Sequence, residues 1–111
     1  MANASPAIAS SIAYAASKAA LNLMTKSLAL TLGPEIRVNA VCPGEVHTPM
    51  LQSERSEPVT QALLERIAAT VPMGRLAEPI EIARVVAFLA SDAASYMTGA
   101  LVSVDAGYGA R

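Results

Sequence analysis

The chain has 111 residues, enough for one small domain, and its 53% hydrophobic and 15% charged residues exclude an intrinsically disordered protein. Eight basic and nine acidic side chains give a formal charge of −1, and neither a basic run nor an aromatic stacking surface is present, so we expect no nucleic-acid partner. Cys42 is the single cysteine, which excludes an internal disulfide and a thiolate metal cluster. No apolar run reaches the roughly 20 residues of a membrane span, so we expect a soluble, cytoplasmic protein without a membrane partner.

The first predicted helix covers residues 14–32. Residues 1–13 are small and show no clear period, which predicts a loop with Ser10 or Ser11 as the cap of the helix that follows. Alanines and leucines at helical spacing then give that helix a wide apolar face. Gly33, expected in a left-handed conformation, and Pro34 end it.

A short strand is predicted next, over residues 37–42. It contains Val38 and Val41, is apolar on both faces, and is followed by the turn-forming pair Pro43-Gly44. Strands of this kind usually lie in parallel sheets that helices cover on both faces. The sequence therefore predicts a buried parallel strand with a helix before and after it.

The second half of the chain predicts a loop, two helices and a strand. Residues 45–58 form a long loop that we interpret as mobile, and apolar residues spaced by four over 59–71 indicate a short amphipathic helix, interpreted as a lid. Pro79, between Glu78 and Glu81, suits the first turn of another helix, which ends near Ser91. Residues 101–104 are expected to form a second buried strand.

These elements are too few to close a core. Two apolar strands and three helices leave each strand with an uncovered edge. The order helix, strand, insertion, helix, strand is half of a doubly wound parallel sheet. We therefore expect an α/β fold that is half of a doubly wound parallel sheet, whose other strands come from residues absent here or from another chain.

Tyr14 and Lys18 are the first candidates for chemistry. Four residues apart on a helix, they project from one face. A nearby ammonium favours the ionised form of a phenol and moves its pKa from about 10 toward the working range of a proton donor or acceptor. Taken alone, the pair also fits an ordinary solvated stripe of Lys18, Asn22 and Lys26.

Several motifs together resemble the short-chain dehydrogenase/reductase superfamily, in particular its 3-oxoacyl-carrier-protein reductase and glucose dehydrogenase branches. They cover nearly the whole chain and follow in order with the spacings of the family. The matching runs are YAASKAAL (14–21), RVNAVCPG (37–44), VHTPM (46–50), PMGR (72–75) with the helix start at 78–83, YMTG (96–99) and VDAG (104–107).

The resemblance implies that residues 1–111 form the carboxyl-terminal half of a Rossmann-like doubly wound parallel sheet whose amino-terminal half is missing. It also implies an oxidoreductase that transfers a hydride between NAD or NADP and a carbonyl or secondary alcohol. It implies Tyr14 as the general acid or base and Lys18 as the residue that lowers its pKa and hydrogen-bonds the ribose of the cofactor. It further implies that Pro43 and Gly44 pass close to the nicotinamide, and that Val46 and Thr48 hold its carboxamide. Ligands of open α/β sheets bind outside the carboxyl ends of strands, which agrees with this placement.

The chain also departs from the family pattern. Met1 stands where the family has the serine that polarises the substrate carbonyl, and we assign that role to none of the serines among the first residues. The catalytic asparagine and the glycine-rich phosphate-binding turn have no counterpart either. Residues without the family role are Ser5, Ser10, Ser11, Asn3, Asn22 and the run Gly107-Tyr108-Gly109.

For several other polar residues we expect neither a catalytic nor a metal-binding role. His47 has no second histidine with which to bind a metal, so we expect no metal site. Cys42 is interpreted as a small core residue and Arg75 as structural. The charges of Glu54, Arg55 and Glu57 are interpreted as a solvated loop face.

Two functions stay open at this point. The first is the nicotinamide-dependent oxidoreductase, incomplete as an isolated chain. The second is a truncated, non-catalytic module for interaction or assembly. The wide apolar face of the helix over residues 14–32 is a surface suited to the second function, interaction or assembly. The resemblance implies a homo-oligomer through the same helix.

Overall fold

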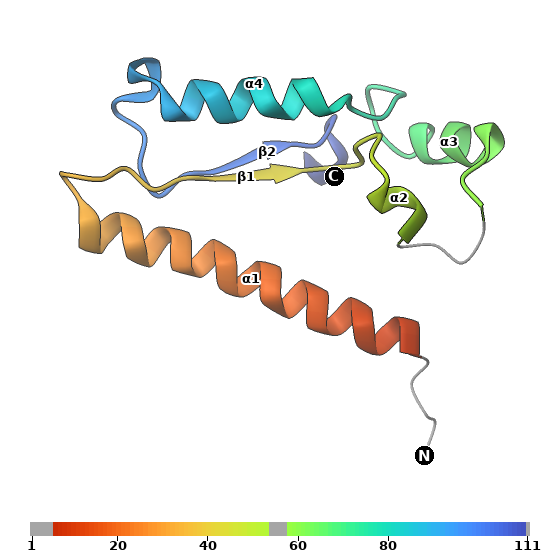
Figure 1. The fold of residues 1–111 in the computed structure, drawn as a ribbon, viewed down its shortest axis with the longest axis horizontal. Coiled ribbons are helices and arrows are strands. Elements are labelled where there is room, and N and C mark those ends of the chain that lie inside the picture. Colours follow the sequence, from red (N-terminus) through yellow and green to blue (C-terminus); the bar gives the residue numbers. More distant parts are fainter. Residues whose placement is uncertain (1–5, 54–57, 111) are drawn as a thin grey trace. The chain divides into compact units, whose positions relative to one another are not determined.

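The computed structural model describes residues 6–53 and 58–110, which belong to two compact units. The first unit comprises residues up to Ala40 together with Met97–Ala100, and the second comprises Val41–Tyr96 and the residues from Leu101 onward. In chain order the elements of Figure 1 are α1 (Pro6–Leu32), β1 (Ala40–Pro43), α2 (Met50–Ser53), α3 (Gln61–Ala68), α4 (Pro79–Ala90), the short 3-10 helix η1 (Asp92–Ala94), β2 (Leu101–Val104) and the 3-10 helix η2 (Tyr108–Ala110).

Helix α1 begins at Pro6, so the prediction of a loop over residues 6–13 is wrong. Proline is well suited to the first turn of a helix, and the alanine-rich run after it contains no residue that breaks one. Ser10 and Ser11 lie inside the helix and cannot cap it.

The carboxyl-terminal end of α1 is the part of the helix that packs. The helix ends at Leu32 as predicted, but the prediction of a left-handed Gly33 is wrong, because its φ is not positive. Its N–H donates to the carbonyl of Ala29. Thr25 and Ala29 are buried. A Cβ on Gly99, which has a φ of +71°, would approach the Ala29 Cβ to 3.3 Å. Gly99 therefore allows the segment 97–100 to lie close against this end of the helix.

Strand β1 begins three residues later than predicted because Asn39 makes a different set of bonds. Its Nδ2 donates to the Met97 carbonyl at 2.9 Å, and its Oδ1 accepts from the Ala100 N–H at 3.0 Å. The amide side chain thus takes the place of a strand partner, and regular pairing starts at Ala40.

Strands β1 and β2 form a two-stranded parallel sheet, joined by the crossover through α4. The Ala40 N–H donates to the Ala100 carbonyl at 2.9 Å, and the Gly44 N–H donates to the Val104 carbonyl at 3.0 Å, so both strands advance in the same direction. The α/β class and the parallel pairing are therefore confirmed. Both strands are half-buried rather than buried as predicted, with Pro43 and Ser103 exposed, because few described residues cover the sheet.

The best-packed part of the second unit surrounds α2 and α3. Leu51, Leu63 and Ile67 are buried against one another, and Val59, Leu64 and Leu76 pack around them. Helix α2 lies inside the stretch predicted to be a loop, so that prediction is wrong at residues 50–53. Helix α3 is confirmed, although it is shorter than the apolar spacing suggested; the Thr60 hydroxyl accepts the Leu63 N–H at its start.

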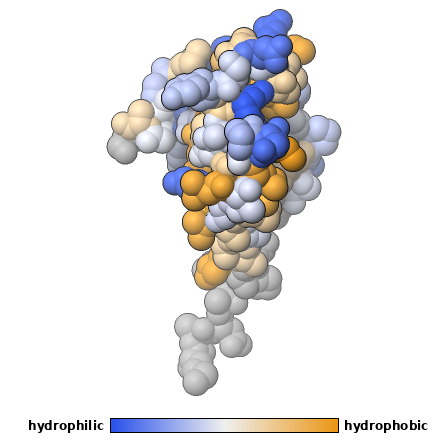
Figure 2. All heavy atoms as spheres, turned by 90° about the vertical axis from the view of Figure 1, so that its left-hand side faces the viewer, coloured by the Kyte–Doolittle hydropathy of each residue, from blue (hydrophilic) through white to orange (hydrophobic). Residues whose placement is uncertain are grey.

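Large apolar side chains remain exposed on α1 and α4, and Figure 2 shows several of them on the face that it displays. They are Ile12, Leu21, Leu23, Met24, Leu28 and Leu30 on α1, and Ile80, Val86 and Phe88 on α4. Exposure on this scale exceeds the scattered apolar residues of an ordinary surface. In the described part of the chain, no helix combines the length and the apolar character that crossing a membrane requires.

Candidate functional site

Tyr14 and Lys18 lie together on α1. The Lys18 Nζ is 5.4 Å from the centroid of the Tyr14 ring, a distance at which an ammonium is attracted to an aromatic face. The spacing of four residues places the pair without help from another element, as the sequence predicted. The Tyr14 side chain is half-exposed, and residues 11–20 are all exposed. Both functional groups are accessible to a ligand.

The second group of predicted site residues follows β1. Pro43 is the last residue of the strand, and Gly44 extends the pairing with β2. A Cβ on Gly44 would lie 2.8 Å from the Cα of Asp105, closer than a real Cβ approaches backbone. Glycine at this position is therefore required by the packing of the chain itself.

Val46 presents a free pair of backbone groups. It forms an isolated parallel bridge with Ala77, in which the Ala77 N–H donates to the Glu45 carbonyl at 3.0 Å and the His47 N–H donates to the Ala77 carbonyl at 2.9 Å. In a parallel bridge of this pattern the N–H and C=O of the central residue point to the opposite side. Within residues 6–53 and 58–110, no hydrogen bond uses these two groups of Val46.

Thr48 and His47 occupy different surroundings. The Thr48 carbonyl accepts the Leu51 N–H at 3.1 Å, which begins α2, and the residue is half-buried. His47 is exposed, and its Nδ1 lies 3.8 Å from a carboxylate oxygen of Glu78. Among the described residues, no three His, Cys, Asp or Glu side chains are grouped so that they could hold a metal ion. His47 also lines a shallow hollow of about 310 Å³, together with Leu64, Arg75, Leu76 and Glu78.

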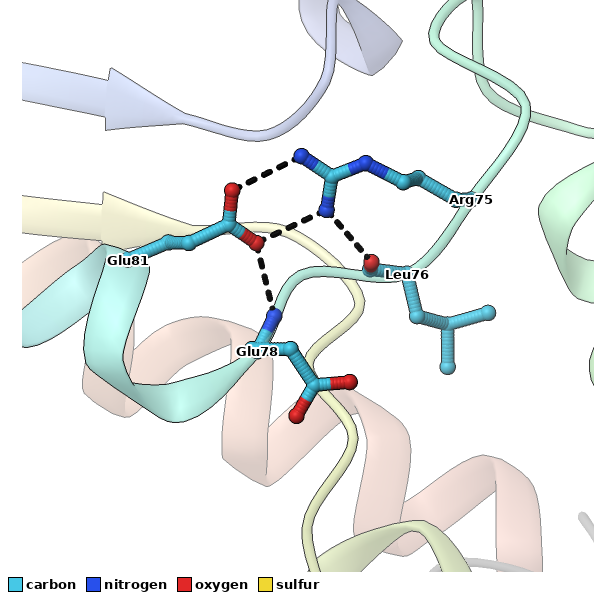
Figure 3. A network of polar contacts seen from close by, with 4 residues as sticks. All are labelled: Arg75, Leu76, Glu78 and Glu81. Atoms are coloured by element: carbon cyan, nitrogen blue, oxygen red, sulfur yellow. Dashed lines mark hydrogen bonds and ion pairs between the residues drawn. The ribbon is translucent and has the colours of Figure 1, made fainter.

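Arg75 forms a polar network with the first turn of α4 (Figure 3). Its two terminal nitrogens each lie 2.7 Å from a carboxylate oxygen of Glu81, and Nη1 also donates to the Leu76 carbonyl at 3.1 Å. The same Glu81 carboxylate accepts the Glu78 N–H at 2.8 Å, one half of a capping box. The hydrogen bond from Arg75, then the one from the Glu78 backbone, lower the pKa of Glu81 to about 2. Hydrogen bonding to Glu81 raises the pKa of Arg75.

Asp105 has a structural role that the VDAG motif (104–107) did not reveal. Its Oδ1 accepts the Gly107 N–H at 3.1 Å and its Oδ2 accepts the Gly109 N–H at 2.9 Å. These bonds stabilise the turn after β2, in which Ala106 has a φ of 55°. An aspartate two and four residues before glycines is a typical signal for such a turn, and it is the signal that would have identified Asp105.

The structure groups the predicted residues by unit. Tyr14 and Lys18 belong to the first unit, and Pro43, Gly44, Val46 and Thr48 belong to the second. Cys42, on β1, is half-buried with a free thiol. The predicted charged face formed by Glu54, Arg55 and Glu57 lies outside the described residues, as do Met1, Asn3 and Ser5.

Comparisons with known proteins agree on one family. The family model described as enoyl-(acyl carrier protein) reductase matches residues 1–109. Oxidoreductase UcpA of Escherichia coli (strain K12) is 48% identical over 99 residues, which are 86% of this chain and 38% of that protein. The chain thus spans about two fifths of the length of this relative.

Solved structures give the same result. A C-terminal deletion variant of Thermoplasma acidophilum aldohexose dehydrogenase is 39% identical, with a TM-score of 0.83, over 89% of this chain and 46% of that one. A variant of actinorhodin polyketide ketoreductase, crystallised with NADPH, is 41% identical, with a TM-score of 0.79, over 88% of this chain and 40% of that one. Sequence and fold together show that the chain belongs to the short-chain dehydrogenase/reductase superfamily and corresponds to the carboxyl-terminal part of its Rossmann-like fold.

Proposed function

We propose that the protein carrying this chain is an oxidoreductase that transfers a hydride between NAD(H) or NADP(H) and a carbonyl or secondary alcohol of a small molecule. Family membership and the dehydrogenases and reductases among its relatives support this class of reaction. The observation that carries the proposal is the exposed pair on α1, with the Lys18 ammonium 5.4 Å from the Tyr14 ring.

In this proposal Tyr14 handles the proton of the reaction. The phenol donates a proton to the substrate oxygen during reduction and removes it during alcohol oxidation. Lys18 favours the phenolate because an adjacent positive charge stabilises the ionised form. Its ammonium, which has three donors, also binds the ribose hydroxyls of the nucleotide.

The residues after β1 fit a nicotinamide nucleotide, which supplies or accepts the hydride when bound. A carboxamide carries one C=O and one NH₂ group, and the free N–H and C=O of Val46 are the complementary donor and acceptor. Thr48 adds a hydroxyl in a half-buried position two residues on. Pro43 and Gly44 carry little side-chain bulk beside the ring, so we assign them contact with the nicotinamide.

Replacement of Tyr14 by phenylalanine tests the proposal. In the protein that carries this chain, we expect Tyr14→Phe to lower kcat by at least roughly a hundredfold, because the proton donor is lost. The Kd for NADH or NADPH is expected to change less than about twofold, since the ring remains. Tyr96→Phe, at a fully exposed tyrosine, is the matched control. Retention of wild-type turnover by Tyr14→Phe would refute the role of Tyr14.

The exposed apolar face of α1 favours a second function, assembly. Leu23 and Leu30 are 67% and 87% exposed, and an apolar helix face of this size is typical of a contact between subunits. We infer a homo-oligomer formed through residues 14–32. A charged residue in place of Leu30 is expected to reduce the mass measured by light scattering. If Leu30→Glu dissociates the protein and the unsubstituted protein shows no turnover with either nicotinamide nucleotide, assembly is the function and catalysis is not.

A further inference from the structure

Arg75 and Glu81 form a bidentate ion pair in the second unit. Two parallel hydrogen bonds of 2.7 Å join the guanidinium to the carboxylate, the geometry in which arginine recognises a carboxylate best. Exposed ion pairs usually contribute little to stability, but bidentate pairs that belong to a network are the exception. This pair also bonds to the Leu76 carbonyl and the Glu78 N–H. The network therefore fixes residues 75–78 against the first turn of α4.

Ala77 lies within residues 75–78 and connects them to residues 45–47. Its N–H and C=O are the two groups that bridge to Glu45 and His47. Every hydrogen bond that aligns residues 45–47 in this bridge therefore ends on a residue between Arg75 and Glu78. If the segment 75–78 moves, the bridge must stretch, and the N–H and C=O of Val46 change direction.

The charges on the pair persist over a wide range of pH. With the pKa of Glu81 at about 2 and that of Arg75 raised, both partners are ionised from mildly acidic to alkaline conditions. The contact is thus a constant feature of the molecule near neutral pH.

We infer that Arg75 and Glu81 are positioning residues for the nicotinamide nucleotide: through Ala77 they orient the free backbone N–H and C=O of Val46. This inference rests on the proposed function, since it assigns Val46 to the carboxamide. It also changes the interpretation of Arg75, from a residue with a merely structural role to one that determines cofactor affinity. Neither Arg75 nor Glu81 touches the cofactor or the substrate in this account.

The test uses Arg75→Met and Arg75→Lys in the protein that carries this chain. Methionine removes the charge and both hydrogen bonds, whereas lysine keeps the charge and loses the paired geometry. Arg84→Met is the matched control, because Arg84 lies on α4 close enough to lower the pKa of Glu81, but its side chain makes no hydrogen bond within the described residues. Glu81→Gln keeps one oxygen that can accept the Glu78 N–H but loses the charge and one of the two acceptors for Arg75.

Two readouts are required. Hydrogen exchange at the His47 and Ala77 amides reports the bridge, with the Leu64 amide of α3 as a check on global unfolding. We expect Arg75→Met to accelerate exchange at His47 and Ala77 about tenfold while Leu64 is unchanged, since a charge-assisted bond is lost. The KM and Kd for NADH or NADPH are expected to rise about tenfold with kcat within twofold, and Arg75→Lys is expected to fall between wild type and Arg75→Met.

The outcomes separate this inference from the function on which it rests. Unchanged exchange at His47 and Ala77 in Arg75→Met would overturn the inference even if the enzyme were active. Faster exchange with unchanged nucleotide affinity would also overturn it. Absence of nucleotide binding by the unsubstituted protein would instead refute the proposed function and, with it, this role of Arg75.

Discussion

The two groups of candidate site residues are positioned by different means. On α1, the geometry of one helix places Lys18 beside Tyr14, and the surrounding residues 11–20 are exposed. After β1, the direction of Val46 depends on a bridge to Ala77, some thirty residues later, and on the ion pair beyond it. The proposed reacting groups thus need only local structure, whereas the proposed cofactor contact needs tertiary structure. Substitutions at a distance are therefore expected to affect cofactor binding more readily than proton transfer.

Lys18→Ala probes the locally positioned group and has a larger expected effect than the variants that follow. We expect kcat to fall roughly a hundredfold and nucleotide affinity to weaken as well, because one ammonium both favours the phenolate and binds the ribose. Lys26→Ala, two turns further along α1 and also exposed, is the matched control. Steady-state kinetics with a nucleotide titration measure both effects. An unchanged Kd would contradict the dual role of Lys18.

Gly44→Ala probes the group positioned by tertiary contacts. The added methyl would lie 2.8 Å from the Asp105 Cα, so β1 and the turn after β2 must separate. We expect the free energy of unfolding to fall by about 1–3 kcal/mol, the usual cost of overpacking. Gly74→Asn is the control, because Gly74 has open space around it and asparagine, among side-chain-bearing residues, adopts a φ of +67° most readily, so only the backbone strain is expected. Equal stabilities of the two variants in urea would argue against this close contact.

Acid is expected to weaken the ion pair between Arg75 and Glu81. The resulting change in stability is expected to be smaller than that of Gly44→Ala. The pKa of Glu81 lies at about 2 in the folded protein against an ordinary value of 4.5, so its stabilising contribution is complete above about pH 4.5 and is lost as the pH falls toward 2. We expect the Tm of Glu81→Gln to fall less than that of the wild type between pH 5 and 2.5. Glu65→Gln, on the exposed side of α3, controls for the loss of a carboxylate. Parallel curves of Tm against pH for wild type and Glu81→Gln would contradict the lowered pKa of Glu81.

The sequence predicted local features well. The spacing of Tyr14 and Lys18, the proline at the start of α4 and the apolar run of β2 each depend on neighbouring residues, and all three are found in the structure. The start of α1 was missed because helix propensity and proline at a first turn outweighed the weak loop signal of small residues. Helix α2 was missed because its single turn is too short to show a period.

The supporting contacts could not be predicted because no regular spacing in the sequence brings their residues together. Asn39 looks like an ordinary strand residue until Met97 and Ala100 are placed beside it. Arg75 and Glu81 are six residues apart, a spacing that brings side chains together on no regular element, and only the turn before α4 does so. The resemblance to the family suggested which residues carry the chemistry and was silent on these contacts.

The central claim is that Tyr14, Lys18 and the backbone of Val46 bind a nicotinamide nucleotide. Hydrogen exchange of the protein that carries this chain, measured with and without saturating NADH and NADPH, tests it without relying on turnover. We predict that one of the nucleotides slows exchange in peptides covering residues 43–48 and in those covering residues 12–20. Binding of a nucleotide that leaves both segments unchanged, or no binding of either nucleotide, would contradict the claim.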